Sequence, residues 1–337
     1  MDRGEAVKPA KTIAVLLISA LIPLTACARD EQAQWVDEDV TFTADGLTLH
    51  GSYRHSSAET PGPAALLISE SGATDRNGDN QVAGPVGNMR QLAELLSDRD
   101  VASLRYDKIG TGKTGLGPYA QRPTEVVSAV YTTGAKAAAR FLADQARTDD
   151  ARISVYALGE GTVHALQLAG DTAAGAPKIH SLGLFQPLPG RYLDIITNRV
   201  RASASPEALS TWLTAVEQVR TDGTVPPNLP EGLGAVLNPG NVNAVIEADK
   251  IDPVALAADV PAGTPVLLTC SDSDNQAGCD AIRPLADALG HTELTLVELE
   301  GVNHVLRDDP TDNVANYASQ APLSPQVVEA LDGFVTE

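Results

Sequence analysis

Positive charge and aromatic side chains are both scarce in this sequence. Among its 337 residues, 24 Lys and Arg stand against 44 Asp and Glu, which gives a formal net charge of -20 at pH 7. A nucleic-acid-binding protein needs clustered Lys and Arg to neutralise phosphates, so this composition argues against that class. Aromatic residues make up only 4% of the chain, yet hydrophobic residues reach 43%. That proportion allows a core to be buried at this length and excludes a chain that is disordered throughout.

The N-terminal region lacks an apolar run long enough to cross a bilayer. Residues 13–24 are mostly apolar, but a transmembrane helix needs ~20 such residues. Arg3, Lys8 and Lys11 precede this run, and a basic segment before a short apolar one is typical of a secretory signal. A buried N-terminal helix is the alternative interpretation, which the charged flank and Pro23 disfavour.

The apolar run ends in Leu24-Thr25-Ala26-Cys27. This segment resembles the bacterial lipobox, in which the Cys is lipid-modified and becomes the mature N-terminus. The resemblance implies that residues 1–26 are a lipoprotein signal peptide. Residues 28–39 are polar enough to link the lipid to the fold, so residues 27–39 are expected to be a tether. The resemblance also implies that the protein is exported and anchored to the cell envelope through Cys27. A diacylated Cys carries more than one acyl chain, which is what stable anchoring requires.

Cysteine is rare, with three residues in the chain. If Cys27 is lipid-modified, Cys270 and Cys279 remain as a pair in a compartment where disulfides persist. We therefore expect a disulfide between them. A metal site is the alternative, but two Cys without a matched pair of His give it little support.

Short strand-like runs alternate with helical periodicity over much of the chain. Residues 40–50 are expected to form a hairpin that turns at Asp45-Gly46. Strands that alternate with helices predict an α/β fold with a mostly parallel sheet. The expected strands are residues 64–69, 101–105, 153–157, 181–185, 265–269 and 294–298, and the expected helices are residues 89–97, 124–145, 162–169 and 327–335.

Residues 188–255 interrupt this alternation. The segment is rich in Pro, Gly and Asn, with short helical pieces between them. It is interpreted as a cap or lid inserted over one end of the sheet, which divides the core into residues 40–187 and 256–337. Its apolar residues are suited to lining an acyl-sized pocket, although such residues more often pack a cap onto a sheet.

Three segments carry a family resemblance. Residues 69–78, Ser-Glu-Ser-Gly-Ala-Thr-Asp-Arg-Asn-Gly, follow a buried strand; residues 104–115 contain Arg-Tyr-Asp-Lys; and residues 300–304 end in His304. In this order they resemble the oxyanion loop, the strand-end loop and the late G-x-x-H segment of the α/β-hydrolase family, in its serine esterase, lysophospholipase and aminopeptidase-like branch. The resemblance covers about residues 40–335. It implies an α/β-hydrolase fold, with a mostly parallel central sheet, helices on both faces and a small helical cap.

The family's nucleophile elbow is altered in this chain. The elbow is G-x-S-x-G on a strand-to-helix turn, and it aligns with Ala157-Leu-Gly-Glu-Gly161. Gly159 therefore stands where the family has its serine, and glycine has no side chain that attacks a carbonyl. Ser154 lies within the expected strand and Thr162 on the expected helix, so neither replaces the missing nucleophile.

The resemblance implies that other parts of the site are retained. His304 aligns with the family's histidine, and Asp274 with the acid that orients it, with Asp272 as the alternative two residues away. The backbone amides of Ser71 and Glu160 align with the two donors of the oxyanion hole.

Glu70 is a second departure from the family, which usually has Gly at this position. An ionised carboxylate near the oxyanion hole repels the negative charge that develops there during hydrolysis. The alternative is that Glu70 points outward to solvent.

Gly110-Thr-Gly-Lys-Thr114 looks like part of a phosphate-binding loop. The complete pattern requires a Gly five residues before Gly112, where this chain has Asp107. We therefore expect no nucleotide binding.

Three functional hypotheses follow. The missing serine favours a non-catalytic protein that binds a small acyl- or ester-like ligand. The second hypothesis is an active hydrolase of carboxylic esters or amides, in which His304 activates a water in the space of the missing hydroxyl. The third is an envelope scaffold, which the retained elbow, His304 and Asp274 disfavour. No cofactor and no metal is expected, and the membrane is reached through the lipid anchor.

Overall fold

The computed structural model describes residues 34–229 and 232–335, besides Met1 and Gly4. The expected signal peptide, Cys27 and the first part of the expected tether fall on residues outside the described ones. Contacts divide the chain into Met1–Gln32 and Ala33–Glu337, and the fold reported below belongs to the second unit.

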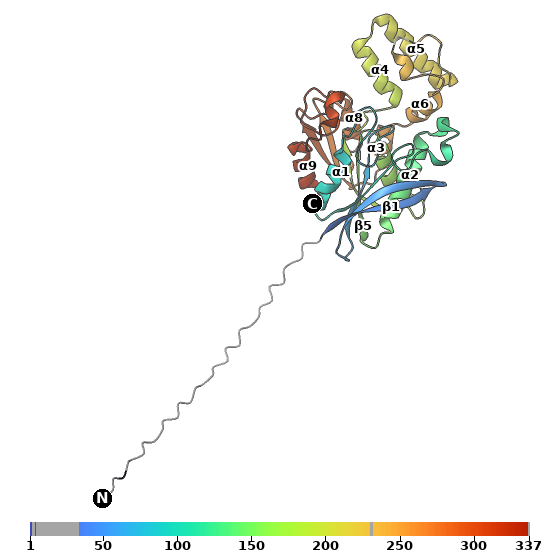
Figure 1. Ribbon diagram of the computed structural model, residues 1–337. Helices are drawn as coiled ribbons and strands as arrows, with labels where there is room; N and C mark the ends of the chain where they lie inside the picture. Colours follow the sequence, from blue (N-terminus) through green and yellow to red (C-terminus); the bar gives the residue numbers. More distant parts are fainter. Residues whose placement is uncertain (2–3, 5–33, 230–231, 336–337) are drawn as a thin grey trace. The chain divides into compact units, whose positions relative to one another are not determined.

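An eight-stranded sheet forms the centre of this unit, with the strand order β1-β2-β4-β3-β5-β6-β7-β8 (Figure 1). β1, β2 and β4 pair antiparallel, and every pair from β4 through β3 to β8 is parallel. The mostly parallel sheet expected from the sequence is confirmed. The strands are β1 (Trp35–Ala44), β2 (Leu47–Ser56), β3 (Gly62–Ile68), β4 (Ala102–Tyr106), β5 (Thr148–Leu158), β6 (Ile179–Phe185), β7 (Pro265–Ser271) and β8 (Glu293–Leu299).

β1 and β2 form the expected hairpin, with the turn at Asp45-Gly46, both in left-handed conformations. This turn geometry fits the right-handed twist of the two strands. The sequence suggested a tether that extends to residue 39. Instead, β1 begins at Trp35, so residues 35–39 belong to a strand. The reason is that β1 is an edge strand whose polar side chains face solvent, which gives it the composition of a linker.

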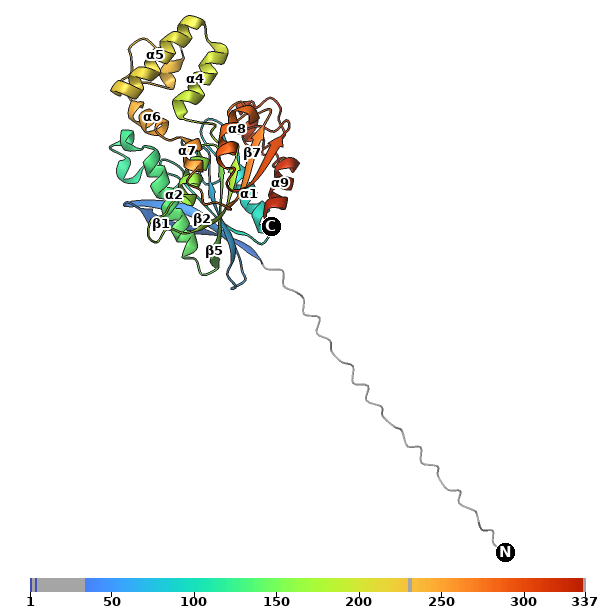
Figure 2. The same ribbon diagram turned by 180° about the vertical axis from the view of Figure 1, so that it is seen from behind.

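Helices cover both faces of the sheet, as expected (Figures 1 and 2). On one face, α1 and α9 pack on β-strand side chains such as Leu67 and Leu267. On the other, α2, α3, α7 and α8 pack on side chains such as Leu66 and Leu268. The sequence did not predict α8. These helices are α1 (Asn88–Ser97), α2 (Ser128–Ala143), α3 (Gly161–Ala169), α7 (Pro253–Ala257), α8 (Cys279–Ala288) and α9 (Pro325–Val335).

A separate group of helices lies between β6 and β7: α4 (Tyr192–Ser203), α5 (Pro206–Asp222) and α6 (Val242–Asp249). In both views these helices lie together beyond the end of the sheet (Figures 1 and 2). Their apolar side chains form a cluster of their own, centred on the fully buried Trp212. The buried carboxylate of Asp249 ties the group together by accepting hydrogen bonds from Arg191, Arg220 and the amide of Leu193. We call α4, α5 and α6 the cap.

The disulfide expected from the sequence joins Cys270, near the end of β7, to Cys279, the first residue of α8. It closes the loop that contains Asp274. None of the helices in the described ranges is long and apolar enough to span a membrane.

Candidate active site without a nucleophile

The elbow between β5 and α3 has the tight geometry that the motif requires. Gly159, at the apex of the turn, has a φ of 55°, a conformation that glycine adopts most readily. Gly161 lies so close to β3 that a Cβ atom there would be 2.7 Å from the carbonyl oxygen of Ile68. The structure therefore retains the backbone of a nucleophile elbow and places Gly159 at its apex.

The carboxylate of Glu70 fills the space beside Gly159. A Cβ atom built on Gly159 would lie 1.7 Å from Oε2 of Glu70 and 2.4 Å from its Cδ. Only 17% of the Glu70 side chain is exposed, so it points inward and not to solvent. The side chain of one loop thus takes the place that a side chain on the elbow would occupy.

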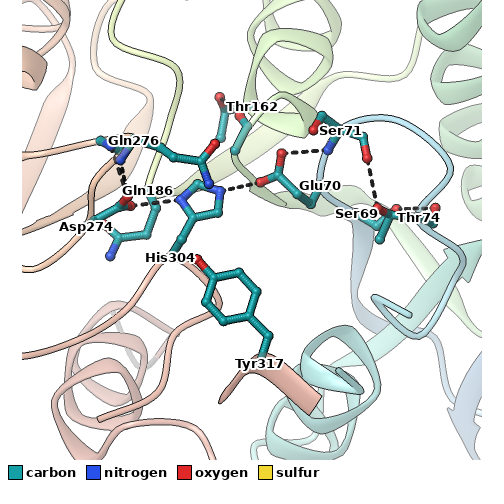
Figure 3. A network of polar contacts seen from close by, with 12 residues as sticks. Ser69, Glu70, Ser71, Thr74, Thr162, Gln186, Asp274, Gln276, His304 and Tyr317 are labelled. Atoms are coloured by element: carbon teal, nitrogen blue, oxygen red, sulfur yellow. Dashed lines mark hydrogen bonds and ion pairs between the residues drawn. The ribbon is translucent and has the colours of Figure 1, made fainter. Parts of the chain in front are cut away.

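His304 lies between two carboxylates (Figure 3). Its Nε2 is 2.6 Å from Oε2 of Glu70, and its Nδ1 is 2.8 Å from Oδ2 of Asp274. Asp274 is fixed in turn, because its Oδ1 accepts hydrogen bonds from the amides of Gln276 and Ala277. The structure therefore selects Asp274 as the partner of His304.

Asp272, the alternative acid, is engaged elsewhere. Its carboxylate accepts hydrogen bonds from the amide of Gly301 and the hydroxyl of Ser273. The ion pairs of His304 in the described part of the chain are with Glu70 and Asp274 and not with Asp272.

The charges of this group are set by its neighbours. Burial alone lowers the pKa of His304, but attraction to Glu70 and Asp274 outweighs burial and raises that pKa well above its usual value. Burial alone raises the pKa of Glu70, but the charge and hydrogen bond of His304 and the amide of Ser71 lower it to about 2. At neutral pH His304 is an imidazolium whose two N–H groups donate to carboxylates on either side. In this state it has no lone pair with which to accept a proton.

The expected oxyanion donor Ser71 is also engaged. Its amide donates a hydrogen bond of 2.6 Å to Oε1 of Glu70. The two oxygens of Glu70 therefore occupy two positions that catalysis needs: one beside the histidine and one at the amide of the oxyanion hole. Glu160, the other expected donor, directly precedes α3, and its side chain lines the cavity described below.

The loop that carries Glu70 is held by buried polar contacts. The backbone amide and guanidinium of Arg76 both bind the carboxylate of Asp107, which follows β4. The buried ammonium of Lys108 donates hydrogen bonds to the carbonyl oxygens of Ser69 and Glu70. Lys108 was not identified from the sequence, although it belongs to the Arg-Tyr-Asp-Lys segment that carried the resemblance.

A cavity of about 440 Å³ adjoins this group, between the elbow, α2 and the cap. Glu70 and Glu160 line it from the core. Tyr131 of α2 and Tyr192 of α4 line it as well, and neither was identified from the sequence. Cavities of this size hold small organic ligands.

Comparisons with known proteins agree with this architecture. No family model and no curated protein sequence matches the chain. Among solved structures, the esterase Pf2001 of Pyrococcus furiosus shares 16% identity at a TM-score of 0.53, over 89% of this chain and 94% of that chain. Est1E of Butyrivibrio proteoclasticus, solved with ferulic acid bound, shares 16% identity at a TM-score of 0.56, over 88% of this chain and 100% of that chain. DcsB, solved with a substrate analogue, shares 15% identity at a TM-score of 0.57, over 89% and 99%.

The strand order, the helices on both faces and these neighbours show that the chain has the α/β-hydrolase fold. This confirms the fold expected from the sequence. At these low identities the likeness shows the fold alone, and function has to be argued from the site.

Proposed function

We propose that this protein is a non-catalytic member of the α/β-hydrolase fold that binds a small ligand under its cap. The observation that carries the proposal is the position of Glu70. Its carboxylate fills the nucleophile's space beside Gly159 and pairs with His304.

Three requirements of ester or amide hydrolysis are missing from this arrangement. Gly159 offers no nucleophile, His304 is charged and cannot serve as a base, and the amide of Ser71 is engaged with Glu70. Serine hydrolases that lose only their triad keep about 10³–10⁴-fold catalysis over water, through the oxyanion hole and binding. Here Glu70 obstructs that residual route as well.

The alternative hypothesis, hydrolysis by a water that His304 activates, needs a neutral imidazole. It would require Glu70 to leave, since the water and Oε2 of Glu70 compete for the same space beside Gly159. The arrangement of Asp274 and His304 supports this alternative, but the raised pKa of His304 does not.

The experiment that tests the proposal measures labelling by a fluorophosphonate probe and turnover of p-nitrophenyl butyrate. Wild type, Gly159→Ser, Glu70→Gly and the double variant are compared. We expect wild type and both single variants to be inert, because Gly159→Ser leaves Glu70 in place. The double variant should gain labelling, and His304→Ala added to it should abolish turnover.

Two results would overturn the proposal. One is turnover by wild type that His304→Ala removes, which would establish hydrolysis by an activated water. The other is labelling of wild type itself, which would reveal a nucleophile outside the elbow.

Export and lipid anchoring form a second part of the proposal, supported by the sequence before and at Cys27. We propose that the mature chain begins at Cys27 and is held at the cell envelope by its lipid. Metabolic labelling with radioactive palmitate tests this. Wild type should be labelled and found with membranes, whereas Cys27→Ser should lose the label; an unlabelled wild type would contradict the anchor.

A further inference from the structure

The acidic groups at the core end of the cavity already have cations beside them. Glu70 is paired with His304. Burial raises the pKa of Glu160, and the buried ammonium of Lys108 attracts its carboxylate. The same ammonium lies over the ring of Tyr131, 5.7 Å from the ring centroid. The groups that select a ligand therefore have to lie elsewhere along the lining.

The N-terminus of α2 adjoins the same cavity. Val126, Val127 and Ser128 line the cavity at the point where this helix begins. The first amides of a helix have no acceptor within it, and a Ser, Thr, Asp or Asn at the preceding position usually supplies one. In α2 that position is Val127, whose side chain accepts no hydrogen bond. In the part of the chain that the structure describes, the amides of Ser128 and Ala129 have no acceptor.

The hydroxyl of Ser128 is a further group without a partner. Ser128 is 7% exposed and lines the cavity. Its hydroxyl makes no hydrogen bond with any residue that the structure describes. A buried hydroxyl that lacks a partner costs free energy. This hydroxyl and the first amides of α2 together form a set of donors for a ligand that brings acceptor oxygens.

Donors at a helix N-terminus suit an anion. The aligned peptide dipoles of α2 place positive potential there, and amides that bind a carboxylate form charge-assisted hydrogen bonds. Arg199 is the one Lys or Arg among the lining residues that the structure describes. It is exposed and donates to the side chain of Gln276, so a carboxylate bound there would stay in water and gain little. The N-terminus of α2 is therefore the better site for an anion.

Much of the remaining lining is apolar. It includes Val126, Val163, Ile195, Ile196, Val245 and Ile251. An inorganic anion would leave this surface unfilled, whereas an alkyl or aryl group would bury it.

We propose that the cavity binds an apolar organic carboxylate, with its carboxylate at the first amides of α2 and the hydroxyl of Ser128, and its hydrocarbon body against the cap. This inference rests on the proposed binding function and specifies its ligand class. It narrows the acyl- or ester-like ligand expected from the sequence to a molecule with a free carboxylate. Such a ligand has no need of the amide of Ser71, which is engaged with Glu70.

Calorimetric titration of the full-length protein with three ligands that share one body tests this inference. The ligands are 4-phenylbutyrate, 4-phenylbutanol and 4-phenylbutylammonium. Salt at about 0.15 M screens the net charge of -20, which repels anions at long range. We expect the carboxylate to bind about ten-fold more tightly than the alcohol, a difference of about 1.4 kcal/mol, and the ammonium to bind most weakly. Equal affinities for the carboxylate and the alcohol, or no binding by any of the three at millimolar concentration, would overturn the inference.

Removal of one hydroxyl locates the carboxylate. Ser128→Ala should weaken the carboxylate about five-fold, because one charge-assisted hydrogen bond is lost, and leave the alcohol within about two-fold. The hydroxyl has no partner in the described structure, so urea denaturation should show unchanged stability. Ser210→Ala, at an exposed site on α5, is the control and should change neither affinity. Equal affinities in wild type and Ser128→Ala would contradict the assigned position.

A carboxylate placed on the protein should compete with the ligand. Ser128→Asp brings an acceptor to the first turn of α2, where an acidic side chain stabilises a helix, so the preference for the carboxylate over the alcohol should disappear. Ser210→Asp adds the same charge at the exposed site and should keep that preference. Arg199→Gln should change the affinity for the carboxylate by less than about two-fold. A larger loss in Arg199→Gln than in Ser128→Ala would place the carboxylate at the cap and overturn the inference.

This test and the test for hydrolysis fail independently. An inert wild type that binds the alcohol as well as the carboxylate keeps the binding function and removes the ligand class. A wild type that turns over esters removes the non-catalytic function, whatever the charge preference of its cavity.

Discussion

Two glycines in this molecule, Gly112 and Gly159, each leave space that a carboxylate fills, but the two carboxylates have different partners. Gly112, in the loop after β4, and Gly159, at the elbow, both have a positive φ, of 44° and 55°. A Cβ atom on Gly112 would lie 2.2 Å from the carboxylate of Asp107, and one on Gly159 would lie 1.7 Å from that of Glu70. In both places the absence of a side chain makes room for a carboxylate.

The partners of the two carboxylates differ. Asp107 is bound by the guanidinium of Arg76 and by the amides of Arg76 and Lys113, and arginine keeps its charge at every accessible pH. Glu70 is bound by His304, whose charge depends on pH. A glycine that makes room for a carboxylate therefore allows an ion pair whose charges are permanent in one loop, between Asp107 and Arg76. In the other it allows a pH-dependent ion pair, between Glu70 and His304.

The largest loss in the free energy of unfolding is expected when the ion pair between Arg76 and Asp107 is broken. The side chains of Arg76 and Asp107 are only 9% and 3% exposed, so Arg76→Leu leaves a buried carboxylate without its cation. The expected loss in the free energy of unfolding is about 3–5 kcal/mol, measured by urea denaturation. Arg122→Ala, which removes an ion pair with both side chains at least half exposed, is the control and should cost about 0.5 kcal/mol or less. A loss for Arg76→Leu as small as that for Arg122→Ala would show that the ion pair between Arg76 and Asp107 does not stabilise the fold.

The next largest losses in the free energy of unfolding are expected from substitutions of Gly112 and Gly159. Gly112→Ala and Gly159→Ala each place a Cβ atom on a carboxylate in a left-handed conformation, so each should cost about 2–4 kcal/mol. In a Glu70→Gly background the cost of Gly159→Ala should fall to about 1–2 kcal/mol, that of the backbone alone.

The cost of Gly112→Ala should also fall once the Asp107 carboxylate is removed, but that background is itself less stable, because Arg76 then keeps only Asp39 and Ser52 as side-chain partners. Urea denaturation of the two double-mutant cycles measures the difference. Additive costs at positions 70 and 159 would contradict the occupation of the elbow by Glu70.

These comparisons show which parts of the molecule the sequence could predict. β3 and β7 were recognisable because a strand buried on both faces is a continuous apolar run. α8 was missed because Pro284 lies in its interior, where proline argues against a helix. Gly159, Asp274 and His304 could be named from local motifs. The pairing of Glu70 with His304 could not, since it joins residues 234 positions apart and depends on space left by a third residue.

A third prediction concerns the pH-dependent pair. Glu70→Gln removes a charge-assisted hydrogen bond and should cost about 2 kcal/mol at its largest. Folding lowers the pKa of Glu70 from 4.5 to about 2, so its contribution is present above pH 4.5 and is lost as the pH falls toward 2. Folding raises the pKa of His304 well above 6.5, so its contribution is full below pH 6.5 and is lost as the pH rises through the raised value.

The difference in unfolding free energy between wild type and Glu70→Gln should therefore be largest between about pH 4.5 and 6.5 and decline on both sides. Urea denaturation over a pH series measures it, with the exposed-site variant Glu217→Gln as the control. A difference that stays constant up to pH 9 would contradict the raised pKa of His304 as its source, and one that vanishes below pH 6.5 would contradict its imidazolium state. Titration of the imidazole by NMR checks the cause directly, since the signal must move to lower pH in Glu70→Gln.

The smallest loss in the free energy of unfolding is expected from removing a hydrogen bond near His304 that leaves no buried charge without a partner. The hydroxyl of Tyr317 donates to Oδ1 of Asp312, which also accepts the amide of His304, while Oδ2 accepts the amide of Asn275. Tyr317→Phe keeps both amide bonds, so it should cost only about 1 kcal/mol in the free energy of unfolding. The NMR titration of His304 should stay as in wild type, because Glu70 and Asp274 remain in place. A loss as large as that of Arg76→Leu would show that the backbone of His304, and not its charged neighbours, is what stabilises this end of the site.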